Sequence, residues 1–239
     1  MNSRTRESQN LWKISMYESE LVNDFLRNEK LFMELIDPFS KGRRKFTLTE
    51  FDSKFGVADI VLGVFKKNVH ISSAPHINPN WLYSLNSLSK GEEFTLSDFV
   101  NKFSISKQLS KKILNHFENT GYVYSSNKDI FVKKKDILPA VEKVISIEAK
   151  INDWRKAIKQ AYRYKRFSSQ SFVLLPKGKE RQAIINIKDF QKYNVGLVTL
   201  GKEGPVIHHT PKILSNIKLN ALARVNEFAI RRYQGGRVF

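Results

Sequence analysis

The sequence predicts an α/β fold, a mixed central sheet flanked by helices, with a small separate domain inserted into it. Apolar runs of strand type alternate with segments of helical periodicity in residues 1–79 and again in residues 137–239. Residues 80–136 break this alternation, because short helices there are followed by a hairpin pattern. We therefore expect a core built from residues 1–79 and 137–239, with a C-terminal helix, and an independent domain at 80–136.

The first part of the core is predicted to contain one helix and two strands. Residues 17–36 show the helical spacing of apolar side chains. Strands are expected at residues 45–51 and 57–65, joined by a turn. The second strand is apolar on both faces except for one carboxylate, Asp59. An unpaired carboxylate there would carry a large desolvation cost, so Asp59 is a candidate functional residue.

The inserted segment is predicted to hold three helices and a hairpin. A helix at 81–88 is followed by a second helix that Thr95 can cap, with Asp98 three residues further on. The third helix begins after Ser106 and stops at Gly121, and a polar turn then joins the two strands of the hairpin. Helices and hairpin in this order resemble a winged helix-turn-helix.

Polar and basic side chains occupy one face of the third predicted helix. Side chains of these types contact phosphates and base edges from the major groove of DNA. The predicted DNA-binding residues are Lys107, Gln108, Lys111, Lys112 and Asn115 on this helix, and Lys133 and Lys134 after the hairpin. Winged helices also serve as protein-docking modules, and that alternative stays open.

The second part of the core returns to alternating strands and helices. The expected elements are a strand at 141–150, a helix at 153–167, a strand at 171–175, a helix at 181–193, a strand at 196–200 and a helix at 211–232. In the first of these strands the period of two places Glu148 and Lys150 on one sheet face, and Ile147 and Ala149 on the other. A glutamate and a lysine at this spacing, with no other signal beside them, usually form a solvated ion pair on the protein surface.

Composition narrows the class of protein. The 239 residues include 41 Lys and Arg against 23 Asp and Glu, a net charge of +18, and no cysteine. The lack of cysteine excludes disulfide scaffolds, Cys-ligated zinc, iron–sulfur clusters and thiol nucleophiles. No stretch reads as a membrane span or a signal peptide, so we expect a cytoplasmic protein without a membrane partner. The positive charge favours a polyanion, and nucleic acid above all, as the partner.

Two acids in apolar strands together with a lysine suggest a divalent cation. Mg²⁺ prefers oxygen ligands, so Asp59, Glu148, the backbone carbonyl of Ala149 and a phosphate oxygen would suffice to hold it. Such an ion supplies a water nucleophile for phosphodiester hydrolysis, and Mn²⁺ is the expected substitute. Lys150 would lie close to that water and stabilise the charge that develops on the phosphate.

The order of these elements resembles the PD-(D/E)XK nuclease superfamily, which has the restriction-endonuclease-like fold. The segments that carry the resemblance are Gly56-Val-Ala-Asp59-Ile-Val, Ile147-Glu148-Ala149-Lys150 and the helix Trp154–Tyr164. The resemblance implies that Asp59 and Glu148 bind metal, that Lys150 assists the nucleophile and that Gln160 lies at the site. It also implies a first-helix acid near the metal, for which Glu18 is chosen over Glu29. The chain departs from the family pattern at Ala58, where proline is usual, and in the long insertion.

The expected function is a Mg²⁺-dependent DNA endonuclease, bacterial or phage-encoded, in transposition, restriction, recombination or phage defence. Because cutting both strands with one site per chain requires two copies or two binding events, a homodimer or a protein partner is a further expectation. The alternative function is a catalytically inactive DNA-binding regulator or assembly protein that keeps the nuclease fold as a scaffold.

Overall fold

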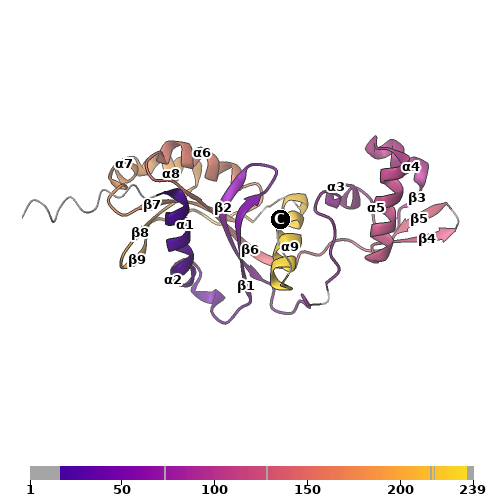
Figure 1. Ribbon diagram of the computed structural model, residues 1–239, viewed down its shortest axis with the longest axis horizontal. Coiled ribbons are helices and arrows are strands. Elements are labelled where there is room, and N and C mark those ends of the chain that lie inside the picture. Colours follow the sequence, from indigo (N-terminus) through magenta and orange to yellow (C-terminus); the bar gives the residue numbers. More distant parts are fainter. Residues whose placement is uncertain (1–16, 73, 128, 216, 218, 236–239) are drawn as a thin grey trace, which may run out of the picture. The chain divides into compact units, whose positions relative to one another are not determined.

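A computed structural model describes residues 17–72, 74–127, 129–215, 217 and 219–235 of the chain (Figure 1). It is an α/β protein with a six-stranded mixed sheet, flanked by helices, and a separate three-stranded sheet. The strand order in the large sheet is β1-β2-β6-β7-β8-β9. Its strands are β1 (Lys45–Asp52), β2 (Val57–Phe65), β6 (Val141–Ala149), β7 (Gln170–Pro176), β8 (Gly196–Gly201) and β9 (Gly204–His209).

The large sheet is mixed because its pairings differ in direction. β1 pairs antiparallel with β2, β7 pairs parallel with β8, and β8 pairs antiparallel with β9. The predicted strands at 45–51, 57–65, 171–175 and 196–200 therefore exist, and β9 is an additional strand that the sequence pattern did not indicate.

The helices beside the large sheet are α1 (Glu18–Arg27), α2 (Glu29–Ile36), α6 (Trp154–Tyr164), α7 (Arg181–Ile185), α8 (Ile187–Tyr193) and α9 (Leu219–Tyr233), with a 3₁₀ turn at Pro38–Ser40. Two predicted helices, 17–36 and 181–193, are each broken in the structure. The breaks lie at Asn28 and Asn186, whose side-chain amides donate to the carbonyl four residues earlier, at 2.9 and 2.8 Å. A side chain that binds its own backbone in this way competes with the regular helix.

The predicted helix at 211–232 was wrong in its first part, because α9 begins at Leu219. The backbone before it is held by other bonds. Leu214 N–H donates to the Ser169 carbonyl at 2.9 Å, and Lys212 N–H donates to the side chain of Asn194 at 2.7 Å. Ile213, in this first part, is 64% exposed and does not lie on a buried helix face. None of the helices in the described ranges is long and apolar enough to cross a membrane.

The chain divides into two compact units. The first unit contains the chain up to Lys41, Ile147–Tyr162 and Ser171–Lys212, and the second contains Gly42–Ser146, Arg163–Gln170 and the chain from Ile213. The predicted insertion thus lies in the second unit together with β1, β2 and α9. Its boundaries at 80 and 136 stay a prediction.

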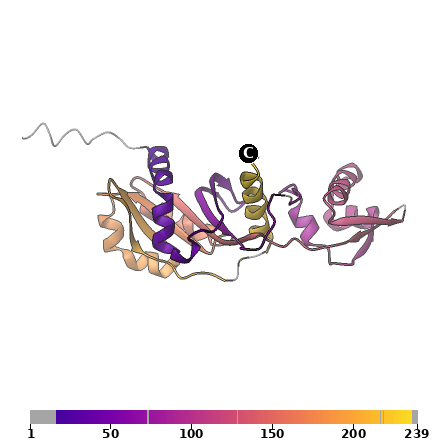
Figure 2. The same cartoon turned by 90° about the horizontal axis from the view of Figure 1, so that it is seen from below.

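The first unit packs helices on both faces of its strands. On β7, Phe172 contacts Phe32 of α2 edge to face, with ring centroids 5.3 Å apart. Its neighbour Val173 belongs to the buried cluster of Trp154 and Phe190, from α6 and α8. Because consecutive strand residues point to opposite faces, α2 and the α6–α8 layer cover opposite faces of these strands, as can be followed in Figure 2.

The inserted segment has its own core within the second unit. Its elements are α3 (Leu82–Asn86), β3 (Glu93–Thr95), α4 (Leu96–Phe103), α5 (Lys107–Asn119), β4 (Val123–Asn127) and β5 (Ile130–Lys133), and the small sheet has the order β3-β5-β4. Phe99, Ile113, Leu114 and Phe117 are buried in its centre. The caps predicted at Thr95 and Ser106 are confirmed, since their hydroxyl oxygens accept from Asp98 N–H at 3.1 Å and Leu109 N–H at 3.2 Å.

Candidate functional site

Glu18, Glu148 and Lys150 form a charged cluster in the first unit. The Lys150 ammonium lies 3.3 Å from Oε1 of Glu148 and 2.8 Å from Oε2 of Glu18. Glu148 is the penultimate residue of β6, and Lys150 follows the strand, with its N–H donating to the Leu174 carbonyl at 3.0 Å. The ion pair agrees with the shared sheet face that the period of two predicts for Glu148 and Lys150.

Burial makes this cluster costly unless its charges stay together. The Glu148 side chain is 1% exposed and that of Lys150 13%, whereas that of Glu18 is 48% exposed. Removing an ion from water costs several kcal/mol, which nearby opposite charge and hydrogen bonds must offset. Lys150 therefore stabilises the buried Glu148 carboxylate and links it to an acid of the first helix. Of the two first-helix candidates, it is Glu18 that reaches this cluster.

Asp59 lies near the start of β2 and is partly buried. The strands that carry Asp59 and Glu148 are neighbours in the sheet, as expected despite the long insertion between them. The start of β2 is held by Tyr164 of α6, whose buried hydroxyl donates to the Val57 carbonyl. Gly56 has a φ of +134°, and a Cβ there would lie 3.2 Å from the Tyr164 ring. Only glycine suits this close, left-handed position.

Gln160, on α6, has a feature that suits a binding site. Its Oε1 atom is buried and accepts no hydrogen bond from the described residues. A buried acceptor without a donor costs about 1–3 kcal/mol, so a donor from outside the chain, such as water, would stabilise it.

The oxygen donors fit Mg²⁺ in kind, because they are carboxylates and a main-chain carbonyl. They do not gather in the number expected: within the described ranges there is no group of three or more His, Cys, Asp or Glu side chains placed to hold a metal. The Oε2 atom of Glu18 accepts from the Lys150 ammonium at 2.8 Å. The metal-ligand roles of Asp59, Glu148, the Ala149 carbonyl and Glu18 stay predictions.

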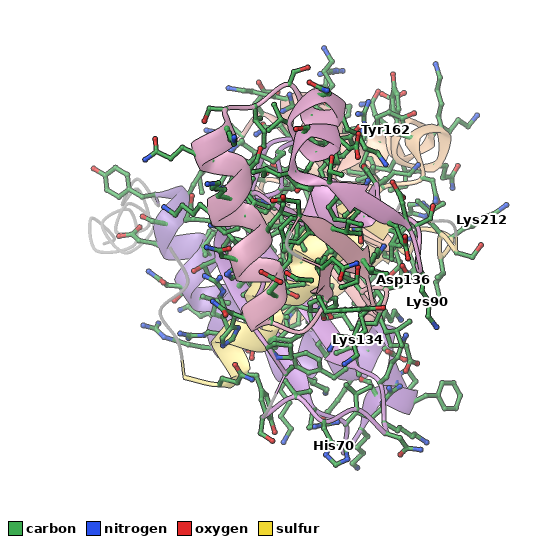
Figure 3. All side chains as sticks on the ribbon, turned by 90° about the vertical axis from the view of Figure 1, so that its right-hand side faces the viewer. His70, Lys90, Lys134, Asp136, Tyr162 and Lys212 are labelled. Atoms are coloured by element: carbon green, nitrogen blue, oxygen red, sulfur yellow. The ribbon has the colours of Figure 1, made fainter. Side chains whose placement is uncertain are left out.

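The predicted DNA-binding face of α5 is exposed. Lys107, Gln108, Lys111, Lys112 and Asn115 all lie at the surface, and so does Lys134, labelled in Figure 3. Lys133 is a correction, because it is 3% exposed and cannot reach a phosphate. Its ammonium donates to the Leu88 carbonyl at 2.5 Å and pairs with Asp136 at 2.7 Å, so it stabilises the interior of the segment.

A surface hollow of about 420 Å³ lies beside this face, between α3 and the turn that joins α4 to α5. Its lining includes Trp81, Tyr83, Phe103 and Leu109. Leu109 of α5 is 38% exposed and contributes to the hollow. The hollow is the feature that suits the alternative, protein-docking role.

Sequence reasoning missed two features of the site. The Glu18–Lys150 bond joins residues far apart in the chain, so no local pattern could have indicated it. The burial of Lys133 follows from its place at the end of a strand inside the small sheet, which a run of three lysines conceals. A search of protein-family models and of curated proteins finds no match to this chain, so the assignment of function rests on its own residues.

Proposed function

We propose that this protein is a Mg²⁺-dependent DNA endonuclease that hydrolyses phosphodiester bonds. The observation that carries the proposal is the buried Glu148 carboxylate with the Lys150 ammonium 3.3 Å away, at the end of the strand that neighbours the one bearing Asp59. A carboxylate and a lysine on a surface strand would be ordinary, but a pair this buried carries a desolvation cost that a structural role does not require.

In the proposed site Asp59, Glu148 and the Ala149 carbonyl would hold the cation. Mg²⁺ bound there would supply a water nucleophile and offset charge on the attacked phosphate. Lys150 orients that water or donates to a phosphate oxygen as negative charge develops. Glu18 positions Lys150 through its 2.8 Å contact. This adds a positioning role for Glu18 to its predicted role as a metal ligand. The Oε1 atom of Gln160, which has no donor among the described residues, accepts a hydrogen bond from a water at the site.

The inserted segment supports the DNA-targeting half of the proposal. Its helix–strand–helix–helix–strand–strand order, with the first strand pairing to the last, supports the proposal that it is a winged helix. The turn between α4 and α5 ends at the Ser106 cap, and α5 then presents an exposed row of lysines. In a helix-turn-helix that second helix is the one that enters the major groove.

The direct test incubates the purified full chain with supercoiled, linear and branched DNA in Mg²⁺ or Mn²⁺. We expect cleavage with either metal and none with a chelator, with one substrate form preferred. Gel-shift measurements on the same DNAs in Ca²⁺ report binding without cleavage. DNA binding without cleavage under every metal condition would favour the inactive regulator instead.

A second prediction concerns the lysines of α5. Changing Lys107, Lys111 and Lys112 together to Ala should weaken DNA binding on all sequences. It should also reduce the slope of log K against log salt by up to about 3, because each lost phosphate contact contributes roughly 1. The measurement is fluorescence anisotropy with labelled duplex DNA at several salt concentrations.

The matched control changes the same number of exposed lysines in the first unit, Lys177, Lys179 and Lys202, to Ala. Net charge falls equally in both variants, so a difference between them reports position and not charge alone. Equal salt slopes for the control and the α5 variant would contradict DNA contact by α5. That result would favour the protein-docking role, for which the hollow beside α5 is the candidate surface.

A further inference from the structure

The C-terminal helix α9 buries two polar side chains in the second unit. Asn226 and Glu227 are each 2% exposed, although they lie in a helix whose other buried residues, such as Val225 and Ala229, are apolar. Buried polar side chains cost free energy unless they are hydrogen bonded, so their partners show what they contribute.

Those partners are backbone groups on both sides of the inserted segment. Ile77 N–H, in the chain that leads into the segment, donates to Oε2 of Glu227 at 2.9 Å. Ala140 and Val141 N–H, in the chain that leads out of it, donate to Oδ1 of Asn226 at 2.6 and 3.2 Å. We name these stretches, residues 66–79 and 134–141, the incoming and the outgoing connection.

Further along α9, the same pattern continues on the incoming connection. Arg231 donates to the Ile77 carbonyl at 3.3 Å, and Gln234 donates to the Ile71 carbonyl at 2.5 Å. The helix also packs on β1 and on α3 (Figure 1). Three side chains of α9, and that of Gln234 directly after it, therefore hold the two connections that join the inserted segment to β2 and β6.

We propose that α9 is a pH-sensitive latch on the inserted segment, in which the protonation of Glu227 decides how firmly the incoming connection is held. The latch depends on neither DNA binding nor cleavage. It would control how freely residues 80–136 move relative to β1 and β2.

The charged and titratable groups near Glu227 and Arg231 come from four parts of the second unit. Arg231 lies one turn further along α9, and Tyr122 comes from the chain between α5 and β4. His116 of α5 and His76 of the incoming connection both interact with Arg231. Nε2 of His116 accepts from Asn78 N–H at 3.1 Å, so it carries no proton while this bond exists.

Burial raises the pKa of Glu227 to about 7, although the Ile77 amide and Arg231 oppose the shift. If the incoming connection opens, water reaches the carboxylate and its pKa returns toward the ordinary value of 4.5. The closed form therefore binds more protons between these two values. Opening becomes easier as the pH rises from about 4.5 to about 7, and the effect is constant above that range.

The two histidines act in the opposite direction. Burial lowers the pKa of His116 and of His76, so protonation below their ordinary value of 6.5 favours the open form as the pH falls. The pH profile of the wild type is thus a sum of opposing contributions. Comparing wild type with Glu227→Gln isolates Glu227, because the histidines are present in both proteins.

The test is hydrogen–deuterium exchange of the full chain, followed by peptides from both connections, at pH 5 and pH 8 and corrected for intrinsic exchange rates. Gln at position 227 keeps an oxygen acceptor for Ile77 N–H and carries no charge. We expect the ratio of opening constants, wild type over variant, to rise by on the order of a hundredfold between pH 5 and pH 8 in residues 66–79. A peptide from β7 should exchange equally in both proteins.

Two further variants keep the result interpretable. Glu203→Gln, an exposed carboxylate in the first unit, is the matched control and should leave the exchange of both connections unchanged. Asn226→Ala removes the acceptor of two amides and should speed exchange in the outgoing connection at both pH values. A wild-type-to-Glu227→Gln ratio that is the same at pH 5 and pH 8 would overturn the proposal, as would unchanged protection of the outgoing connection in Asn226→Ala.

Discussion

Glu148→Gln is expected to lower the rate of Mg²⁺-dependent DNA cleavage by at least about a hundredfold, the effect typical of removing a group that stabilises charge in the transition state. The amide keeps the size of the side chain but is a poor ligand for Mg²⁺. Lys150→Met should give a loss of similar size, because it removes the ammonium that in the proposed mechanism faces the attacked phosphate. The proposal assigns DNA affinity to phosphate contacts elsewhere, so both variants should retain it. Single-turnover cleavage and anisotropy measure the two properties separately.

The free energy of unfolding of variants at Glu148 and Lys150 distinguishes a loss of catalysis from a loss of folding. Lys150→Met alone leaves the buried Glu148 carboxylate without this counter-charge, and we expect a loss of about 3–5 kcal/mol in the free energy of unfolding. The double variant, with Gln at 148 and Met at 150, removes both charges and should recover most of that loss. Urea denaturation of the four proteins completes the cycle.

The decisive outcome is a double variant that is as stable as wild type and still inactive. Asp59→Asn provides the matched test on the neighbouring strand and should be equally inactive. Normal cleavage by well-folded Glu148→Gln and Asp59→Asn variants would show that the assigned site is wrong.

Tyr164→Ala is expected to destabilise the second unit by about 3–5 kcal/mol, as is usual for a buried aromatic side chain. Tyr164 is fully buried, and its ring packs against Phe167 with centroids 5.8 Å apart. The substitution leaves a cavity beside Gly56 and removes the hydroxyl that binds the Val57 carbonyl, two residues before Asp59. Tyr164→Phe keeps the ring and loses one hydrogen bond, so a cost of about 1 kcal/mol is expected. Thermal and urea unfolding measure both.

The control for Tyr164 lies on the same helix. Tyr162, labelled in Figure 3, is 49% exposed, and Tyr162→Ala should change the free energy of unfolding by less than about 1 kcal/mol. If Tyr164→Ala is as mild as Tyr162→Ala, then Tyr164 does not hold the start of β2, and the placement of Asp59 has another cause.

Local patterns were sufficient for most strands and for the caps of the inserted segment. Nearly continuous apolar runs located β2 and most of β6, as expected for strands that are buried on both faces. Thr95 and Ser106 marked their helix starts, since a cap acts through bonds to residues only three positions away. These interactions are short in sequence, so the sequence determines them by itself.

Patterns of apolar spacing were insufficient where a local side chain or a distant backbone group competes with the helix. Asn28 and Asn186 break their helices through bonds to their own backbone, which spacing alone does not reveal. The chain before α9 is bound at Leu214 by the Ser169 carbonyl, a partner that becomes adjacent only in the folded protein. Ile213 accordingly lies at the surface and not on the buried face of a helix.

For the candidate site, the sequence by itself determined which residue types share a face: the period of two places Glu148 and Lys150 side by side. Only the tertiary structure decided that this pair is buried, that Glu18 binds the lysine, and that the ammonium of Lys133 turns inward. It also brought α9 to both connections of the inserted segment, where Asn226 and Glu227 meet backbone groups far away in the chain. Burial and long-range pairing are properties of how elements pack against one another, so a pattern read along one element does not contain them.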